Sequence, residues 1–174
     1  MLTCRGMRTK NGKRIEMGTG YNYKCKKCGC EFTMFLGSGF LGYESCEKAK
    51  DEILSGELGE EWKTAYSSTS RPAICREKAV FICDCCGHWL RDDLTVLYAP
   101  DDIESVEEIF GSKEPPYFWF RGEEDGLFRI VKQTEKACPE CGKTMRRANE
   151  DDFAKFPCPE CGEPNAATAG ILWD

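Results

Sequence analysis

The chain repeats one short pattern four times: two cysteines separated by two residues and followed by glycine. Cysteine thiolates bind soft metal ions, and a two-residue spacer lets both sulfurs reach the same ion. The glycine permits the positive φ that turns backbone N–H groups toward sulfur. We call the copies knuckles 1 to 4 in chain order: residues 25–29, 83–87, 138–142 and 158–162. Four knuckles supply eight ligands, enough for two closed tetrahedral sites.

The four knuckles can pair in three ways, and their spacing favours one of them. Sixteen residues separate Cys141 from Cys158, a spacing typical of a two-knuckle zinc site, so we predict that knuckles 3 and 4 share one ion. Knuckles 1 and 2 then share the other. An interleaved cross-brace would close two long loops at a larger entropic cost, and nesting is the third way. The predicted ligands are Cys25, Cys28, Cys83 and Cys86 for site 1, and Cys138, Cys141, Cys158 and Cys161 for site 2.

The remaining cysteines and the single histidine are not expected as ligands. Cys85 falls between two cysteines that already have the knuckle spacing, and Cys30 is expected as a small apolar strand residue. His88 follows knuckle 2, and we expect it at the surface or around the ligands, because four cysteines already fill the site. The other three are expected as free or buried thiols: Cys4, Cys46 and Cys75.

Composition indicates a globular protein with reduced thiols. The chain has 174 residues, 41% of them hydrophobic, which supports a core of one domain or two small ones. Thirteen cysteines could suggest disulfides, but eight fall into knuckles and the basic N-terminus is not followed by an apolar signal segment. Metal binding in a reducing compartment fits better than disulfides. We therefore expect a soluble cytoplasmic protein without a membrane span.

Charge is distributed unevenly along the chain. Residues 1–27 carry a net charge of +7 and residues 28–174 a net charge of −13, which together give −6. We expect residues 1–16 to be a flexible basic arm, with translation starting at either Met1 or Met17. The net acidity opposes bulk attraction to nucleic acid. Local basic patches could still contact it: Lys24, Lys26, Lys27, Arg146 and Arg147.

Hydrophobic periodicity places the knuckles on β-hairpins. Alternating residues on both sides of knuckle 1 predict a hairpin, and strands at 79–82 and 94–98 flank knuckle 2. Helical periodicity between them predicts two short helices inside an insertion at 37–78, and an acidic helix follows Pro100 and ends at Gly111. The predicted organisation is the arm, a first metal-bound unit over 17–112, a β-hairpin over 113–135 with strands near 117–120 and 127–131, and a second metal-bound unit over 136–174.

These residues resemble the zinc-ribbon family. Knuckles 3 and 4 both read Cys-Pro-Glu-Cys-Gly, which is similar to the rubredoxin-type knuckle that many ribbons use for structural zinc. The resemblance covers residues 20–36, 79–98 and 134–174, and the long helical insertion departs from a simple ribbon. It implies a small α+β fold held by zinc, with two ribbons of antiparallel hairpins. It specifies metal and fold but no function, because ribbons occur in proteins with many tasks.

The sequence favours a non-catalytic, zinc-binding protein that acts as a protein-interaction or adaptor module with two Zn²⁺ ions. A four-cysteine zinc site is closed, whereas catalytic zinc keeps an open position, and with one histidine no convincing catalytic triad is available. One alternative is a nucleic-acid-associated protein such as a transcription accessory. Another is a rubredoxin-like electron carrier, since four thiolates accept iron as well as zinc. The partner is expected to be a protein, with no membrane involved.

Overall fold

The computed structural model describes residues 19–37, 42–113, 126–153, 155–164 and 167–172. These residues form a small α+β fold. Its strands are β1 (Thr19–Lys24), β2 (Glu31–Leu36), β3 (Ala73–Ile82), β4 (Trp89–Pro100), β5 (Phe128–Gln133), β6 (Lys136–Ala137), β7 (Thr144–Arg147) and β8 (Ala167–Leu172). Its helices are α1 (Gly42–Ser55), α2 (Glu60–Ser68), α3 (Ile103–Phe110) and α4 (Glu150–Phe153).

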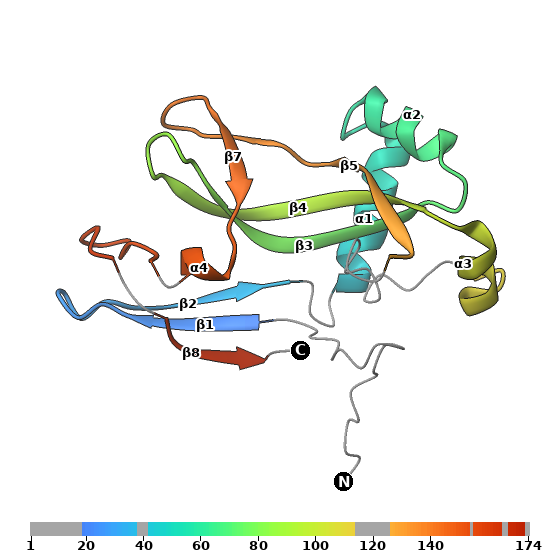
Figure 1. Ribbon diagram of the computed structural model, residues 1–174. Coiled ribbons are helices and arrows are strands. Elements are labelled where there is room, and N and C mark those ends of the chain that lie inside the picture. The colour runs from blue at the N-terminus through green and yellow to red at the C-terminus, as the bar shows by residue number, and fades with distance from the viewer. Residues whose placement is uncertain (1–18, 38–41, 114–125, 154, 165–166, 173–174) are drawn as a thin grey trace, which may run out of the picture.

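The strands make two antiparallel sheets, one with the order β2-β1-β8 and one with the order β5-β4-β3-β7-β6 (Figure 1). The larger sheet is built on β3 and β4, which pair from Ala73↔Tyr98 to Ile82↔Trp89. Knuckles 1, 2 and 3 lie at the turns that join β1 to β2, β3 to β4 and β6 to β7, and knuckle 4 precedes β8. The predicted hairpins around knuckles 1 and 2 are confirmed.

The predicted helical insertion is present as α1 and α2. Gly56 and Gly59 separate the two helices, and their φ angles of 86° and 108° are ones that side-chain-bearing residues rarely adopt. The helices cover part of one face of the large sheet, because their apolar sides face it. The buried contact is formed by Ala49, Ile53, Trp62, Ile74 and Leu97.

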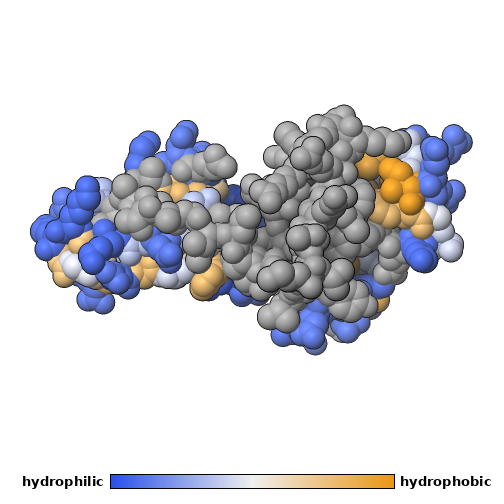
Figure 2. Space-filling view, turned by 90° about the horizontal axis from the view of Figure 1, so that it is seen from below, coloured by the Kyte–Doolittle hydropathy of each residue, from blue (hydrophilic) through white to orange (hydrophobic). Residues whose placement is uncertain are grey.

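The acidic helix α3 begins and ends as predicted. The Asp102 carboxylate accepts hydrogen bonds from two backbone amides of the first turn, and Gly111 ends the helix with a φ of 62°. Val106 is buried, whereas Ile103 and Ile109 are 40% and 42% exposed. Figure 2 shows a hydrophobic patch among hydrophilic atoms at the right-hand end of the molecule, the end that carries α2 and α3 in Figure 1. None of the helices in the described ranges is long and apolar enough to cross a membrane.

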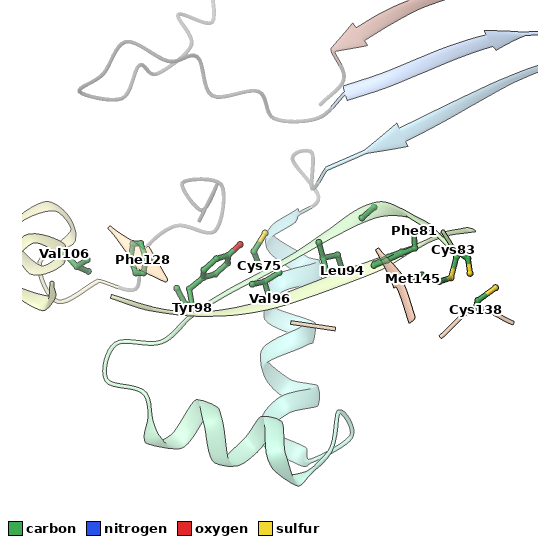
Figure 3. Packing of buried hydrophobic residues seen from close by; sticks show 12 residues of the cluster. Cys75, Phe81, Cys83, Leu94, Val96, Tyr98, Val106, Phe128, Cys138 and Met145 are labelled. Atoms are coloured by element: carbon green, nitrogen blue, oxygen red, sulfur yellow. The ribbon is translucent and has the colours of Figure 1, made fainter. Parts of the chain in front are cut away.

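One face of the β3–β4 ribbon carries the largest core cluster. In Figure 3 the cluster extends along the ribbon from Val106 and Phe128 at one end to Cys83 and Cys138 at the other. These two cysteines belong to knuckles 2 and 3, so candidate metal ligands form one end of the core. Its middle is filled by Cys75, Phe81, Leu94, Val96, Tyr98 and Met145.

A second cluster joins the two sheets through the segment around α4. Phe156, 2% exposed, lies edge-on to Tyr23 of the small sheet and to Trp89 of the large one, with ring centroids 6.2 and 5.0 Å away. The Tyr23 hydroxyl donates to the Phe153 carbonyl at 3.2 Å, and burial raises the pKa of Tyr23 to about 12. This segment therefore holds the sheets together through both apolar contact and a buried hydrogen bond.

The open edge of β3 is closed by segments from elsewhere in the chain. Gly37 exchanges backbone hydrogen bonds of 2.9 and 3.1 Å with Lys78, and the Ala148 amide donates to the Val80 carbonyl at 2.8 Å. Beyond these points β7 pairs with the end of the strand. An edge whose backbone groups are satisfied in this way offers little for another strand to pair with.

The predicted end of the insertion at residue 78 is wrong, because β3 already begins at Ala73. The strand predicted from the sequence begins only at residue 79, after the charged run at 76–78. In the fold each of these charges meets an opposite one from another element: Arg76 with Glu52 at 2.6 Å, Glu77 with Arg147 at 2.6 Å, and Lys78 with Asp93 at 2.5 Å. Long-range charge pairing lets a polar run continue a strand.

The compact ribbon expected over residues 136–174 is not formed, because its strands are divided between the two sheets. β7 pairs with β3, whereas β8 pairs with β1. Of the hairpin predicted over 113–135, β5 is the second strand, and it pairs with β4. The first predicted strand of that hairpin, at 117–120, and the basic arm at 1–16 lie outside the described residues.

The aromatic contact between the sheets predicts a large loss on truncation. Phe156→Ala should lower the free energy of unfolding of the metal-loaded protein by about 3 to 5 kcal/mol, because it leaves a cavity among buried rings. The matched control is Phe35→Ala, whose ring is 37% exposed, with an expected loss of about 1 kcal/mol or less. Urea denaturation measures both, and equal losses would contradict the role given to Phe156.

Candidate metal centres

All four knuckles fold into the same turn. In knuckle 1 the Cys25 amide donates to the Cys30 carbonyl at 2.8 Å, and the Gly29 amide donates back to the Cys25 carbonyl at 2.9 Å. The same two bonds, at 2.7 or 2.8 Å, recur at the corresponding positions of the other three knuckles. The four knuckle glycines have φ between 71° and 75°, which confirms the expected left-handed conformation.

This turn aims backbone amides at the first sulfur of a knuckle. The amides of Cys28 and Lys27 both donate to the Cys25 thiolate, and the Cys28 amide does most to lower the pKa of Cys25 to about 6. In knuckle 2 the Cys86 amide is the main donor that lowers the pKa of Cys83 to about 7. Hydrogen bonds to a thiolate favour the form that binds metal.

The eight knuckle cysteines gather into two groups of four. The outer centre combines knuckles 1 and 4, and the inner centre combines knuckles 2 and 3. The members are Cys25, Cys28, Cys158 and Cys161 for the outer centre, and Cys83, Cys86, Cys138 and Cys141 for the inner centre. The predicted pairing of knuckle 1 with 2 and of 3 with 4 is therefore wrong. The interleaved alternative is not formed either, and the arrangement is nested.

The spacing of the sulfurs suits a tetrahedral ion. Within each group the ligand atoms all lie within 4.8 Å of one another. Contacts between knuckles are 3.5 and 3.6 Å in the outer centre and 3.4 and 3.6 Å in the inner one. A tetrahedral ion with metal–sulfur bonds of about 2.3 Å places its sulfurs about 3.8 Å apart. Both groups could therefore hold a metal ion with little movement.

The electrostatics of these groups also suit a bound cation. The Cys30 amide stabilises the Cys28 thiolate, but burial and the neighbouring sulfurs outweigh it and raise the pKa of Cys28 to about 12. In the inner centre the Lys143 amide is likewise outweighed, chiefly by the Cys83 sulfur and burial, and the pKa of Cys141 rises to about 12. Four adjacent thiols cannot all ionise without compensation. A bound cation supplies the positive charge that lets them do so.

Sheet register explains why knuckle 3 meets knuckle 2. β5 returns antiparallel to β4 with Val96 opposite Gln133, and the Thr134 amide donates to the Thr95 carbonyl at 2.9 Å. Farther along, Lys136 forms a 2.5 Å ion pair with Asp92. The chain therefore reaches knuckle 3 beside the start of β4, where knuckle 2 ends. Knuckle 4 is left for knuckle 1.

A signal for this pairing was present in the sequence. The predicted strands leaving knuckle 2 and entering knuckle 3 run toward and away from the same acidic helix. If they pair as an antiparallel hairpin around that helix, their outer ends must meet. The sequence prediction instead pairs the strand at 127–131 with residues 117–120, and knuckle spacing then favours knuckle 4 as the partner of knuckle 3.

Ion pairs connect elements around both centres. Lys27 of knuckle 1 meets Glu163, just after knuckle 4, at 3.0 Å, which spans the outer centre. Beside the inner centre, Arg146 binds Asp84 of knuckle 2 at 2.9 Å and Asp152 of α4 at 2.6 Å. The hydrogen bonds from Arg146 lower the pKa of Asp152 to about 2. Arg146 thus ties knuckle 2 to the segment that joins the sheets.

The five basic residues singled out for nucleic-acid contact lie at the surface but do not form one continuous group of free charges. Besides Lys27 and Arg146, Lys24 pairs with Glu31 at 2.6 Å and Arg147 pairs with Glu77 at 2.6 Å. Lys26 is exposed. Carboxylates therefore neutralise four of the five side chains.

His88 contributes its backbone to the inner centre. Its carbonyl accepts the Cys83 amide at 2.8 Å, and its own amide donates to the Cys86 thiolate. This agrees with the expected place around the ligands. Cys30 and Cys85, half-buried and exposed respectively, stand outside both groups of four, as predicted.

The fold and these sites define a small α+β protein with two four-cysteine clusters that could each bind a metal ion. No family model matches the chain, and a search of curated proteins and a search of solved structures each found no match. The case for metal binding therefore rests on the cysteine geometry itself.

The nested pairing can be tested by counting metal ions in double variants. Cys25→Ser/Cys158→Ser removes two ligands of the outer centre and should retain one ion after treatment with a competing chelator. Cys25→Ser/Cys138→Ser damages both centres and should retain none. Native mass spectrometry gives the count, and Cys30→Ser/Cys85→Ser is the control that should keep two. Loss of both ions from the first variant would contradict nesting.

Proposed function

We propose that the chain binds two Zn²⁺ ions in structural sites and serves as a non-catalytic protein-interaction module. The observation that carries the metal assignment is the pair of four-thiol groups at tetrahedral spacing, each with backbone amides aimed at sulfur. Four thiolates fill the coordination sphere of zinc and leave no position for a substrate or a reactive water.

A structural role for the ions is supported by where the centres lie. Structural zinc stabilises small folds by about 10 to 16 kcal/mol in zinc-finger peptides. The outer centre connects Cys28 to a cysteine 130 positions away, and the inner centre forms the end of the largest core cluster. An ion at each place would therefore hold together elements that are distant in the sequence.

Metal identity has a direct test. The purified chain should be colourless and contain two zinc ions, and Co²⁺ in their place should give the visible spectrum of tetrahedral cobalt–thiolate. Removal of the ions with a strong chelator should abolish cooperative unfolding, measured by circular dichroism. A coloured protein with iron and reversible reduction would support the rubredoxin-like electron carrier instead, since the same four thiolates accept iron.

The interaction role is supported by an exposed apolar surface on α3. Ile103 and Ile109 are 40% and 42% exposed on a helix whose Val106 is buried. Large aliphatic side chains at an accessible position are suited to contact with another protein. Acidic residues flank them on the same helix, which favours a partner with basic groups around an apolar centre: Asp102, Glu104, Glu107 and Glu108.

The nucleic-acid alternative has weaker support. Four of the five basic side chains that would contact phosphate already pair with carboxylates, and the chain carries a net charge of −6. Non-specific binding depends on free positive charge and falls steeply with salt. Salt-sensitive retention of the metal-loaded chain on DNA would nevertheless favour this alternative over protein contact.

A tagged, metal-loaded chain should capture the same protein partner with and without nuclease treatment. Ile103→Glu/Ile109→Glu should weaken capture at least tenfold, because it places charge in the apolar contact. Leu54→Glu, at an aliphatic position of α1 that is 43% exposed, is the matched control, because it places the same charge outside this surface and keeps the isoleucines. Capture that disappears with nuclease, or that is equal in both variants, would contradict the interaction role assigned to α3.

A further inference from the structure

Two cysteines outside the metal centres lie together at the edge of β3 that α1 contacts. Cys46 of α1 and Cys75 of β3 are 5% and 7% exposed, and both are free thiols. They belong to different elements and are separated by 28 residues that include α2. A thiol pair formed by tertiary contact is a place where two sulfurs can react with each other.

The position of Cys46 is fixed by the edge of β3. Its sulfur accepts a hydrogen bond from the Arg76 amide at 3.2 Å and lies 4.0 Å from the carbonyl oxygen of the same residue. The backbone groups of Arg76 and Lys78 point to the same edge of β3, and those of Lys78 form hydrogen bonds with Gly37. Cys46 therefore occupies the place of a neighbouring strand, directly beside Cys75.

The two thiols also interact with each other, and they are not equivalent. A hydrogen bond from the Cys75 thiol is the largest influence on Cys46 and lowers its pKa, with the Arg76 amide acting in the same direction. The pKa of Cys75 is raised by the same contact and by burial. Cys46 is thus the better nucleophile, and Cys75 keeps its proton.

We propose that Cys46 and Cys75 are an oxidation site. A peroxide oxidises the two thiols to a disulfide, which links α1 covalently to β3. The Cys46 thiolate attacks one oxygen of hydrogen peroxide, the O–O bond breaks, and the departing hydroxide takes up a proton to leave as water. The Cys75 sulfur then attacks the resulting Cys46 sulfenic acid, and the S–O bond breaks to release a second water. Two thiols lose two electrons and two protons, and the peroxide is reduced to two waters.

The bond would close a loop that contains most of α1 and the whole of α2. A disulfide across a loop of this length stabilises mainly by restricting the unfolded chain. We expect the apparent Tm of the metal-loaded protein to rise on the order of 10 °C after oxidation and to return after dithiothreitol.

The test treats the metal-loaded full chain with one equivalent of hydrogen peroxide. Intact mass should fall by two hydrogen atoms, peptide mapping should join Cys46 to Cys75, and the metal content measured in the same sample should stay unchanged. In Cys75→Ala, Cys46 should instead gain one oxygen atom that a sulfenic-acid reagent traps. Cys30→Ser is the matched control, since it removes a half-buried thiol that lies outside both groups of four and should leave the cross-link intact.

Three results would overturn the proposal. The disulfide could map to other cysteines, the ions could leave before the bond forms, or Cys75→Ala could still lose two hydrogen atoms. Because mapping of the unaltered chain is decisive by itself, the proposal stays testable if Cys75→Ala does not fold, and Cys46→Ala provides a second variant that should lose no hydrogen atoms. None of these outcomes depends on which metal the two centres bind.

Discussion

The antiparallel ribbon of β3 and β4 is the constraint on which the rest of the structure depends. Its ten residue pairs fix one direction for the large sheet. β5 must return along β4, and this return delivers knuckle 3 to knuckle 2. Different elements then cover the two faces of the ribbon. On one face, α1 and α2 cover one part, and α4 with the small sheet covers another. On the opposite face, α3 lies at the far end. The inner centre closes the ribbon at its knuckle end.

Local features of this fold are readable from the sequence because they depend on nearby residues. The knuckle turns follow from two cysteines and a glycine, and all four glycines adopt the left-handed conformation. Helix α3 follows from Asp102 as its cap and Gly111 as its end. The strands beside knuckles 1 and 2 follow from apolar alternation. The eight cysteines that gather in the two groups were also identifiable by spacing.

Spacing does not predict which of those cysteines share an ion, because the alternatives differ little in loop-closure entropy. Knuckles 2 and 3 are separated by 51 residues and knuckles 3 and 4 by 16. Closing the longer loop costs only about 1 kcal/mol more, because the entropy grows with the logarithm of loop length. Burial of a single ring such as Phe156 between the sheets outweighs that difference. Tertiary packing therefore decides the partners.

The start of β3 at Ala73 is not predictable from the sequence for a similar reason. The ion-pair partners of Arg76 and Glu77, which let the strand continue through charged residues, are distant in the sequence.

Nesting also sets an order of events during protein synthesis. Cys28 and its partner Cys158 are 130 positions apart, so at translation rates of about 5 to 20 residues per second the first half of the outer centre waits roughly 6 to 26 s for the second. The inner centre can be complete well before then, since Cys86 and Cys138 are 52 positions apart. During that interval the two thiols of knuckle 1 lack the cysteines of knuckle 4, and the β1–β2 hairpin lacks β8, the third strand of its sheet. The nascent chain is therefore most exposed to wrong metal ligation and oxidation at the two cysteines of knuckle 1, Cys25 and Cys28.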